Sequence, residues 1–415
     1  MSKTSYNKRK ILNDPVYGFI AIPNELVFDI IEHKYFQRLR RIKQLGLTHL
    51  VYPGALHTRF QHAIGAMNLM TQAIEVLRSK GNIITELEAD AVIYAILLHD
   101  IGHGPFSHAL ESTLVKDLGH ETLSALFMYH LNLEFDGRLG LAIDIFNNRY
   151  HKKFLHQLVS SQLDVDRLDY LKRDSFFSGV SEGVINSDRL IAMLDVKDDE
   201  LVVEAKGIYS LEKFIVARRL MYWQVYLHKT VIAAEYMLVK VLERAKKLAE
   251  DGVSLFATPS LNLFLKNNFS KQHFKDDKQL LDQFSELDDF DIFTAMKVWQ
   301  THSDPVLSFL SDCIVNRKLF KIEIRKEPFS SDYIELIKSK TQKELNISED
   351  ETNYVVLYDR IENNAYNPQC DRIGILNKDG TVVNVVDSSD QINVSVLTRM
   401  ESKYFICYPK RVNIS

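Results

Sequence analysis

The residues with the clearest capacity for chemistry are histidines, and they cluster in the N-terminal third of the chain. Histidine is the commonest metal ligand and the side chain that titrates near neutral pH. The chain has 14 histidines, and chance would place about two of them between positions 57 and 120. Six fall there: His57, His62, His99, His103, His108 and His120. This cluster predicts a metal-centred site.

The dipeptide His99-Asp100 is the strongest local candidate for metal ligation. It follows a buried-looking apolar run that ends at Leu98. A neutral imidazole and a carboxylate can share one divalent ion with ligands from elsewhere, and such oxygen–nitrogen ligation suits Mn, Fe, Ni or Zn. A core histidine beside a helix-capping aspartate is the structural alternative. The histidines that follow at His103 and His108, around a Gly-Pro turn, favour the metal site.

Two flanking segments could complete the ligand set. Arg59 and His62 are three residues apart and share a helical face, and the small residues Gly65 and Ala66 on that face leave room for another helix. Downstream, residues 164–174 read DVDRLDYLKRD. In a helix, one face of this segment would carry Asp166, Tyr170, Arg173 and Asp174. A solvated, salt-bridged helix would explain these charges but not the apolar residues between them. The expected ligand set is His62, His99, Asp100 and Asp166.

Helical spacing of apolar residues recurs along most of the first 325 positions. The expected helical segments are 24–46 in two parts, 58–77, 86–98, 107–115, 121–131, 154–174, 211–250 and 278–322. The segment 211–250 reads as one long helix because it contains neither Gly nor Pro. A short hairpin is expected over 194–209, with Asp198-Asp199 at its turn. Strand-like runs follow at 354–358, 372–376, 381–386 and 404–408.

These patterns predict a mainly α protein of two parts. A helical catalytic body covers residues 1–325 and holds the metal site within 57–174. A small α+β domain covers residues 326–415. The length of 415 residues agrees with two or three domains.

Composition excludes several classes of protein. The 51 Lys and Arg residues nearly balance 55 Asp and Glu, and the net charge of −4 argues against a general nucleic-acid coat or a polybasic membrane binder. Cys313, Cys370 and Cys407 are too few and too scattered for a disulfide framework or a cysteine-based zinc site. The longest apolar run, 91–98, is far shorter than the roughly 20 residues of a membrane helix. We expect a soluble, cytoplasmic protein.

Five segments, in order and spacing, resemble the HD-domain phosphohydrolases. Within that superfamily the chain is most similar to the deoxynucleoside triphosphate (dNTP) triphosphohydrolases of bacteria and of animals, the latter carrying a sterile-alpha-motif domain. The matching segments are NDPVYG at 13–18, FQRLRRIKQLG at 36–46, YPGALHTRFQH at 52–62, LHDIGHGPFSH at 98–108, and 164–174. The resemblance covers roughly residues 10 to 230 and implies an HD-domain helical bundle.

The resemblance assigns roles to the histidine cluster. It implies that His62, His99, Asp100 and Asp166 are the metal ligands, and that the metal activates water and polarises the α-phosphate. His108 matches the histidine that protonates the departing 5′-oxygen. Glu111, where close relatives often have Asp, matches its carboxylate partner, and His120 matches a further histidine of this relay.

The resemblance also implies how substrate and effector bind. Gln44 and Leu45 would lie against the sugar and favour deoxyribose. The positions that would grip triphosphate or sugar are Arg59, His103, Arg167, Tyr170, Asp174, Arg218 and Tyr226. An activating nucleotide between subunits would use Lys10, Glu32 and the basic stretch Arg38, Arg40, Arg41 and Lys43. For this stretch an amphipathic surface is the alternative. A homodimer or homotetramer is implied.

The leading hypothesis is therefore a metal-dependent hydrolase that converts dNTP and water to deoxynucleoside and triphosphate. Its resident ion would be Mn, Fe, Ni or Zn, with Mg able to join through the substrate phosphates. One alternative keeps the metal site but acts on another phosphate ester, such as a nucleoside monophosphate or a cyclic nucleotide. Another is a nucleotide- or nucleic-acid-binding regulator with a vestigial site. The complete ligand set and the net charge argue against this last reading. The native metal, the preferred base, the effector and the role of the C-terminal part stay open.

Overall fold

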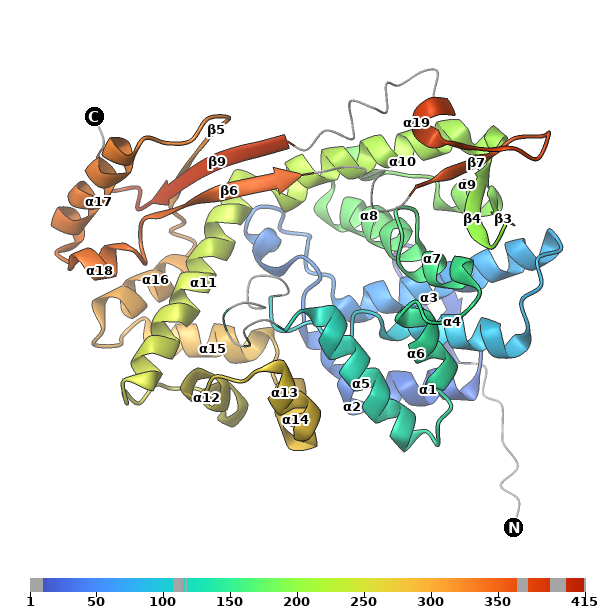
Figure 1. Ribbon diagram of the computed structural model, residues 1–415. Helices are drawn as coiled ribbons and strands as arrows, with labels where there is room; N and C mark the ends of the chain where they lie inside the picture. The colour runs from blue at the N-terminus through green and yellow to red at the C-terminus, as the bar shows by residue number, and fades with distance from the viewer. Residues whose placement is uncertain are drawn as a thin grey trace, which may run out of the picture.

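The fold is built around three helices that meet at the histidine cluster. The computed structural model describes residues 10–106, 113, 115, 118–363, 372–388 and 401–413. Helix α3 (Arg59–Ser79) packs against both α4 (Glu86–Leu98) and α8 (Val165–Ser178). Figure 1 shows these helices inside the larger, right-hand part of the molecule, with α5, α6 and α7 on one side. The mainly α fold class is confirmed.

The sequence explains why these three helices begin where they do. Thr58 and Gln61 form a capping box at the start of α3, and Thr85 and Glu88 form one at the start of α4. At α8 the Asp164 side chain accepts a hydrogen bond from the backbone N–H of Arg167 at 2.7 Å. Each cap fixes the helix start, and therefore fixes which side chains of the helix face the cluster.

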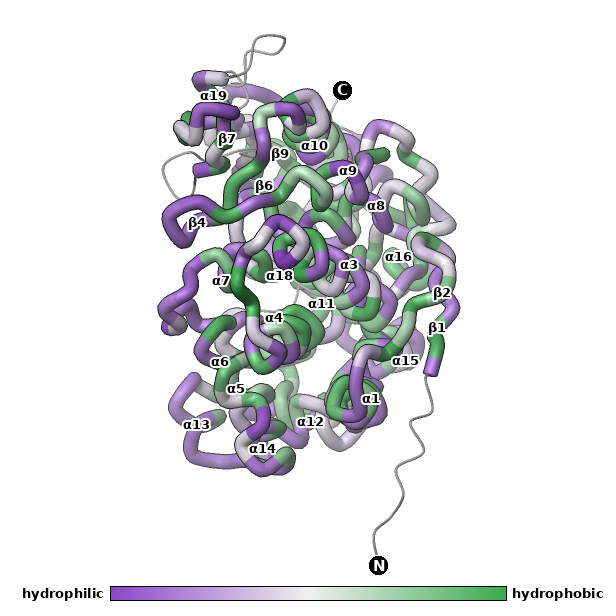
Figure 2. The backbone as a smooth tube through the Cα atoms, turned by 90° about the vertical axis from the view of Figure 1, so that its right-hand side faces the viewer, coloured by the Kyte–Doolittle hydropathy of each residue, from purple (hydrophilic) through white to green (hydrophobic). Residues whose placement is uncertain are grey.

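The C-terminal part of helix α4, residues 91–98, is apolar around its whole circumference. All eight residues of 91–98 are buried, and Figure 2 shows α4 largely green, in contrast to the purple α13 at the surface. A helix that is hydrophobic all round belongs in the core. It therefore holds the His99-Asp100 pair at its C-terminal end in a fixed place.

The remaining helices complete the body. Near the N-terminus lie α1 (Glu25–Glu32), α2 (Lys34–Gln37) and the short turns Arg38–Arg41 and Gly46–Leu50. The middle contains α5 (His120–Glu134), α6 (Gly140–Phe146), α7 (Lys153–Val159), α9 (Ser187–Ala192), α10 (Ile208–Met221) and α11 (Lys229–Glu250). These are followed by α12 (Pro259–Lys266), α13 (Lys271–Asp276), α14 (Lys278–Ser285), α15 (Asp289–Trp299), α16 (Pro305–Val315), α17 (Ser331–Leu345), α18 (Glu349–Thr352) and α19 (Val385–Ser388).

The expectation of one long helix over 211–250 was wrong. A π-helical turn, Tyr222–Tyr226, separates α10 from α11. The Leu227 N–H donates to the Tyr222 carbonyl at 2.7 Å, and the His228 side chain caps the start of α11. The extra residue of a π turn needs neither Gly nor Pro, and such turns are frequent at functional sites. It turns Tyr222 and Tyr226 toward the candidate site.

The expected hairpin is present and belongs to a larger sheet. Strands β3 (Leu194–Lys197) and β4 (Glu200–Glu204) pair antiparallel, with Asp198 and Asp199 at φ 53° and 65° in the turn. Strand β4 also pairs in parallel with β7 (Gly374–Leu376), which pairs with β8 (Val382–Asn384). The C-terminal part thus contributes two strands to a sheet that the body begins.

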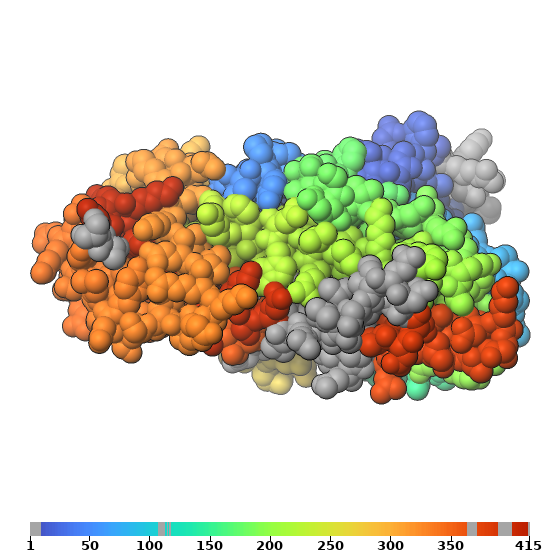
Figure 3. All heavy atoms as spheres, turned by 90° about the horizontal axis from the view of Figure 1, so that it is seen from above, coloured from blue at the N-terminus to red at the C-terminus, as the bar shows by residue number. Residues whose placement is uncertain are grey.

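A second sheet holds the rest of the C-terminal α+β part. Strand β9 (Glu401–Tyr408) lies between β5 (Lys321–Arg325) and β6 (Leu357–Asn363), and α17 packs against it. Figures 1 and 3 show α17 and β9 at one end of the molecule and β7 with α19 at the other. The division at residue 325 stays a prediction, although both sheets join residues from the two sides of it. Several expected bounds were wrong, because 321–325 is a strand, β6 begins at Leu357 instead of Tyr354, and residues 385–386 belong to α19 instead of a strand.

Three smaller features bear on the remaining expectations. A hairpin of β1 (Ile11–Asp14) and β2 (Gly18–Ala21) precedes the helical body. Cys313 and Cys407 are buried free thiols, whereas Cys370 lies outside the described residues. Among the helices that the structure describes, none is both long and apolar enough to cross a membrane.

Glu88 anchors the helix that carries His99-Asp100. We expect it to make the free energy of unfolding depend on pH in the acid range. Its carboxylate accepts hydrogen bonds from Tyr150 at 2.7 Å and from Lys152 at 2.9 Å. Burial opposes ionisation, but these donors and Thr85 lower the pKa of Glu88 from 4.5 to about 2. The stabilisation is therefore present above about pH 4.5 and is lost as pH falls toward 2.

We expect E88Q to lower the free energy of unfolding at pH 7 by about 1–2 kcal/mol. The loss stays this small because Lys152 is partly exposed, so that water screens its ion pair with Glu88. The difference from the wild type should shrink between pH 4.5 and 2. Urea unfolding across this pH range measures it. Glu86 is the matched control, because its side chain is 88% exposed in the same helical turn. An equal effect of E86Q and E88Q would contradict the prediction.

Candidate active site

The four predicted ligands lie together at the meeting point of α3, α4 and α8. His62 Nε2 is 3.1 Å from Asp166 Oδ1 and 3.7 Å from Asp100 Oδ2. His99 Nε2 is 3.4 Å from His62 Nε2, from Asp100 Oδ1 and from Asp166 Oδ1. The ligand atoms of His62, His99 and Asp166 form one of the groups that could hold a metal ion. Segments 104 residues apart in the chain thus converge on one point.

These separations fit a divalent ion. Ligand atoms that each lie about 2.0–2.2 Å from one ion are roughly 3–4 Å from one another, which is the spacing among His62 Nε2, His99 Nε2 and Asp166 Oδ1. Asp100 borders this group, with Oδ2 near His62 and Oδ1 near His99. Two imidazoles and two carboxylates are a donor set that several divalent transition metals accept. The residues therefore could hold such an ion, and the donor set does not decide which one.

The electrostatics of the cluster also suit a cation. Burial alone would lower the pKa of His62, but hydrogen bonds and charges from Asp166 and Asp169 raise it to about 10. Burial alone would raise the pKa of Asp166, but the hydrogen bonds from His62 and His99 hold it far below its usual range. The carboxylates therefore require positive charge beside them, which either protonated histidines or a bound cation supplies.

A second layer of buried charges orients His62. Its Nδ1 lies 2.7 Å from Asp169 Oδ2, and Arg173 donates to both Asp169 oxygens at 2.9 Å. Arg173 also donates to Asp14 at 2.7 Å. An Nδ1–H held by Asp169 leaves Nε2 free as a ligand, which is the usual arrangement around a metal-binding histidine. A Cβ on Gly65 would lie 2.1 Å from both Arg173 Nη2 and Asp169 Oδ1, so the close approach of α8 requires glycine there.

His99 is oriented by the backbone of its own helix and by α5. Its Nδ1 lies 2.6 Å from the Ile96 carbonyl oxygen, which directs Nε2 toward the cluster. The Ser124 hydroxyl donates to the His99 carbonyl at 2.6 Å and accepts from the Gly102 N–H at 2.9 Å. A Cβ on Gly102 would lie 2.3 Å from the Ser124 nitrogen. The loop after α4 can therefore follow α5 closely only with glycine at 102.

Beside the four ligands lies a second group of titratable side chains. Asp100, His103 and His120 could also share an ion. His103 Nδ1 is 3.3 Å from Asp100 Oδ1, and the His103 and His120 rings stack with centroids 3.9 Å apart. Arg59 forms an ion pair with the other oxygen of Asp100. His108 and Glu111, the predicted proton donor and its partner, lie outside the described residues.

The basic stretch around Arg38 is largely structural. Arg38 is fully buried and donates to the carbonyl oxygens of Leu287, Ile101 and His103. It therefore fixes the loop that carries His103. Farther along, Arg41 pairs with Asp288, and Lys43 lies 3.5 Å from Asp289. The amphipathic-surface alternative was wrong for Arg38, while Arg40 is exposed. The nucleotide-effector site stays a prediction.

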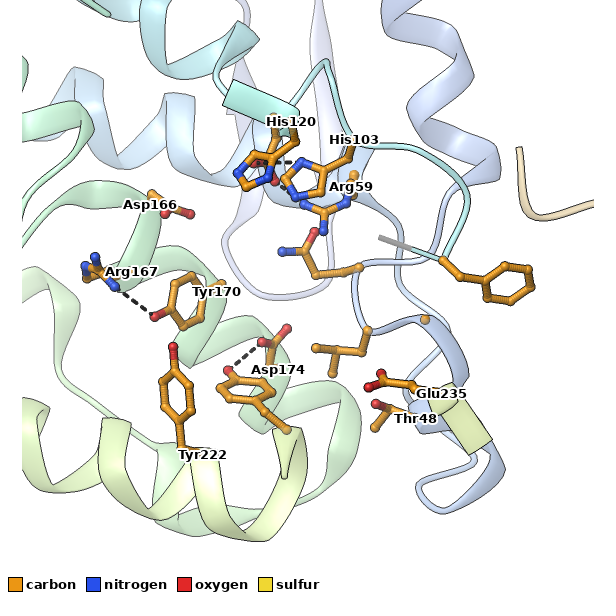
Figure 4. A pocket seen from close by; sticks show the side chains of 16 residues that line it. Thr48, Arg59, His103, His120, Asp166, Arg167, Tyr170, Asp174, Tyr222 and Glu235 are labelled. Atoms are coloured by element: carbon orange, nitrogen blue, oxygen red, sulfur yellow. Dashed lines mark hydrogen bonds and ion pairs between the residues drawn. The ribbon is translucent and has the colours of Figure 1, made fainter. Parts of the chain in front are cut away.

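A pocket of about 340 Å³ opens from the cluster, and Figure 4 shows the residues that line it. Eight of the predicted substrate residues line it: Gln44, Leu45, Arg59, His103, Arg167, Tyr170, Asp174 and Tyr226. It is also lined by Gly46, Thr48, Asp100, Phe106, His120, Asp166, Tyr222 and Glu235. Arg218 is not among these residues, because its guanidinium turns to Gln162, at 3.0 Å.

Helix α8 forms one wall of the pocket with residues spaced by four. Asp166, Tyr170 and Asp174 all line it, as Figure 4 shows. Asp174 Oδ2 accepts from the Tyr226 hydroxyl at 2.6 Å, and Asp174 Oδ1 lies 2.8 Å from His57 Nε2. Asp174 therefore fixes the π turn against the wall. The expectation that Arg173 shares this face was wrong, because Arg173 points toward α3.

The same cluster borders a second cavity, of about 700 Å³. His99, Asp100, His120 and Asp166 line it, together with surface cations that include Arg149, Lys271 and Lys275. The candidate ligands His62, His99, Asp100 and Asp166 (the metal-ligand cluster) thus border both cavities, through Asp100 and Asp166.

Several site residues were not predicted. Asp169 carries no signal beyond its charge, Arg173 is expected on the face of Asp166 instead of beside Asp14, and His57 appears only as one histidine of the cluster. Asp14 belongs to segment 13–18, which resembles the family, but the resemblance assigned no function to Asp14. Tyr222 and Glu235 carried no signal, because a Tyr or Glu within a helical pattern is usually a packing or surface residue.

Family models and a solved structure show to which family the chain is similar. A family model described as HD domain matches residues 59–174, and one described as HD associated region matches residues 185–257. The chain superposes with a TM-score of 0.94 on the crystal structure of a phosphohydrolase from Bacteroides thetaiotaomicron. The two are 55% identical, and the match covers 97% of this chain and 100% of that chain.

Two curated relatives extend the comparison. The uncharacterised protein YwfO of Bacillus subtilis is 33% identical over 341 residues, which are 80% of this chain and 76% of YwfO. The deoxynucleoside triphosphate triphosphohydrolase SAMHD1 homolog of Dictyostelium discoideum is 34% identical over 265 residues. That match covers 58% of this chain and 51% of the relative, so the similarity spans about half of the relative's length.

Proposed function

Because the chain belongs to the HD-domain phosphohydrolases, and is a hydrolase of that family, we propose that its substrate is a dNTP and its products are deoxynucleoside and inorganic triphosphate. One observation carries the proposal. The metal-ligand cluster opens into a pocket lined by Gln44, Leu45 and Tyr170, with Arg59 and Arg167 beside the cluster. Such a pocket offers cations to phosphates and an aromatic and aliphatic wall to a sugar. The similarity to the Dictyostelium triphosphohydrolase supports the same substrate.

The cations around the cluster would bind the triphosphate. Arg59 pairs with Asp100 and faces the pocket. Arg167 donates to the Ser161 carbonyl at 2.6 Å and lies 3.2 Å from Asp164, which fixes its guanidinium beside Tyr170. A divalent ion held by the four ligands would polarise the phosphoryl oxygens and activate water. Positioned cations then stabilise the charge that develops on the phosphate during transfer.

The reaction breaks the bond between the α-phosphorus and the 5′-oxygen. Water adds its oxygen to phosphorus, the triphosphate keeps that oxygen, and the 5′-oxygen leaves and takes up a proton. We assign the proton to His108, with Glu111 and His120 as its relay, on the resemblance alone. Stacking of His120 on His103 supports a place for His120 beside the pocket. Gln44 and Leu45 are assigned to the deoxyribose.

Other parts of the proposal concern the molecule as a whole. We propose a cytoplasmic homodimer or homotetramer, with Mn, Fe, Ni or Zn as the resident metal and Mg as an additional ion on the phosphates. An activating nucleotide would bind between subunits near Lys10, Glu32 and Arg40. The exposed positions of Glu32 and Arg40 support this assignment.

The test of the reaction is product analysis with each dNTP in the presence of Mn²⁺ or Mg²⁺. We expect deoxynucleoside and triphosphate in equal amounts, measured by reversed-phase and ion-exchange chromatography, and no turnover in excess EDTA. Ribonucleoside triphosphates, nucleoside monophosphates and cyclic nucleotides are the comparison substrates. Release of pyrophosphate or single phosphate would refute the reaction, and preferential turnover of a monophosphate would refute the substrate.

A further inference from the structure

The pocket has a second polar end, away from the metal-ligand cluster. Figure 4 shows Glu235 and Thr48 side by side at this end, while His103, His120 and Arg59 lie at the other. Glu235 comes from α11, which packs against the turn that contains Thr48. This polar end therefore lies beyond the residues assigned to phosphate.

The chain backbone brings Glu235 close to the proposed sugar residues. Gly46 directly follows Gln44 and Leu45 and has a φ of +48°. A Cβ at Gly46 would lie 3.4 Å from the Phe106 carbonyl oxygen and 3.9 Å from Glu235 Oε1. The carboxylate therefore lies next to the loop that is proposed to hold the sugar.

Glu235 differs from the other carboxylates of the pocket. Asp100, Asp166 and Asp174 each contact a histidine, and Asp100 also contacts an arginine. Within the described part of the chain, Glu235 has no hydrogen bond or ion pair. Burial raises its pKa to about 7. The Glu235 side chain is partly exposed and lines the pocket, so a ligand that enters can supply the hydrogen-bond donor that the protein does not.

We propose, on the basis of the dNTP function above, that Glu235 binds the base of the substrate and selects guanine. An ionised carboxylate offers only acceptors. Guanine is the one base whose Watson–Crick edge presents two adjacent N–H donors, at N1 and N2, so both carboxylate oxygens can accept in parallel. Adenine and cytosine present one donor beside an acceptor, and thymine presents one donor between two carbonyl oxygens that repel the carboxylate.

The variant that tests this is E235Q, which keeps the volume and replaces one acceptor with a donor. Pairwise competition among the four dNTPs gives the ratios of kcat/KM. We expect the wild type to prefer dGTP to dATP by at least about tenfold, and E235Q to lose most of that preference. E243Q is the control, because Glu243 lies on the same helix and pairs with Lys240 at 2.7 Å.

Binding separates this proposal from the proposed reaction. Isothermal titration of dGTP and dATP in EDTA measures base preference without turnover. Weaker dGTP binding by E235Q together with unchanged dATP binding supports the role of Glu235, even if no triphosphate is released in the presence of metal. Equal base preference of wild type and E235Q overturns it, even if every dNTP is hydrolysed to triphosphate.

Discussion

We expect H99A to remain folded and to lose hydrolase activity by roughly a thousandfold or more. His99 supplies one of four clustered ligand atoms, 3.4 Å from three others. A bound metal contributes several kcal/mol of transition-state stabilisation, and each 1.36 kcal/mol corresponds to a tenfold change in rate. The His99 side chain is 10% exposed at the C-terminal end of α4, so its removal costs some packing but leaves the buried apolar residues 91–98 of the helix in place. Activity, bound metal and the unfolding temperature are measured on the same preparation.

The control for H99A is H151A, because His151 is exposed and lines neither cavity. It should retain the activity and the metal content of the wild type. An H99A protein that keeps its metal but loses activity would show that His99 acts on substrate instead of as a ligand. An H99A protein with full activity would remove the four-ligand site from the proposal.

The four clustered side chains could be singled out from the sequence because the spacing within each segment is local. His99 and Asp100 are adjacent, Arg59 and His62 share one turn, and Asp166 opens a helix that begins at its own cap. Each of these signals lies within a few residues of sequence. Their convergence could be expected only as a requirement of the chemistry, and the packing of α3 on α4 and α8 fulfils it.

The second layer could not be predicted, because the contacts of Asp169 with His62 and of Arg173 with Asp14 are distant in sequence, although Asp169 and Arg173 are only four residues apart. Arg173 was placed on the same face as Asp166, and helical periodicity allows that. This face of α8 is wide, however, and part of it packs closely against α3 at Gly65 while the rest lines the pocket. Asp169 and Arg173 turn toward α3, while Tyr170 and Asp174 turn toward the pocket. Only the packing of the neighbouring helix decides between these two directions.

The same reason explains the errors in the second half of the chain. The π turn at Tyr222–Tyr226 arises without a helix-breaking residue, where Asp174 bonds to Tyr226 across 52 residues. Strand β7 pairs with β4, which lies about 170 residues earlier in the chain, so no residue near β7 in the sequence indicates which strand it pairs with. The strand-like composition of the C-terminal part was correct, but the sheet to which each strand belongs depends on tertiary contacts.

Loss of the buried Asp169–Arg173 pair next to His62 should change stability and metal affinity by different amounts. D169N places an amide NH₂ group against the Arg173 guanidinium and removes the charge that holds His62 Nδ1–H. We expect a loss of about 3–5 kcal/mol in unfolding free energy, since the cation is left poorly compensated. Metal affinity should fall about 10- to 100-fold, since the orienting carboxylate is gone. Chemical unfolding and metal titration measure the two effects separately.

The double variant D169N/R173M distinguishes the orientation of His62 by Asp169 from the role of Asp169 as the counter-ion of Arg173. Removing the guanidinium should restore part of the stability, because Asp14 still accepts the N–H groups of Val16 and Tyr17 at 2.9 and 3.0 Å. It should not restore metal affinity, because His62 still lacks its carboxylate. D304N is the matched control, since Asp304 pairs with Arg244 far from the site and should affect stability alone. If the double variant regained wild-type metal affinity, Asp169 would act only as the counter-ion of Arg173, and the orientation of His62 would have to come from α3 itself.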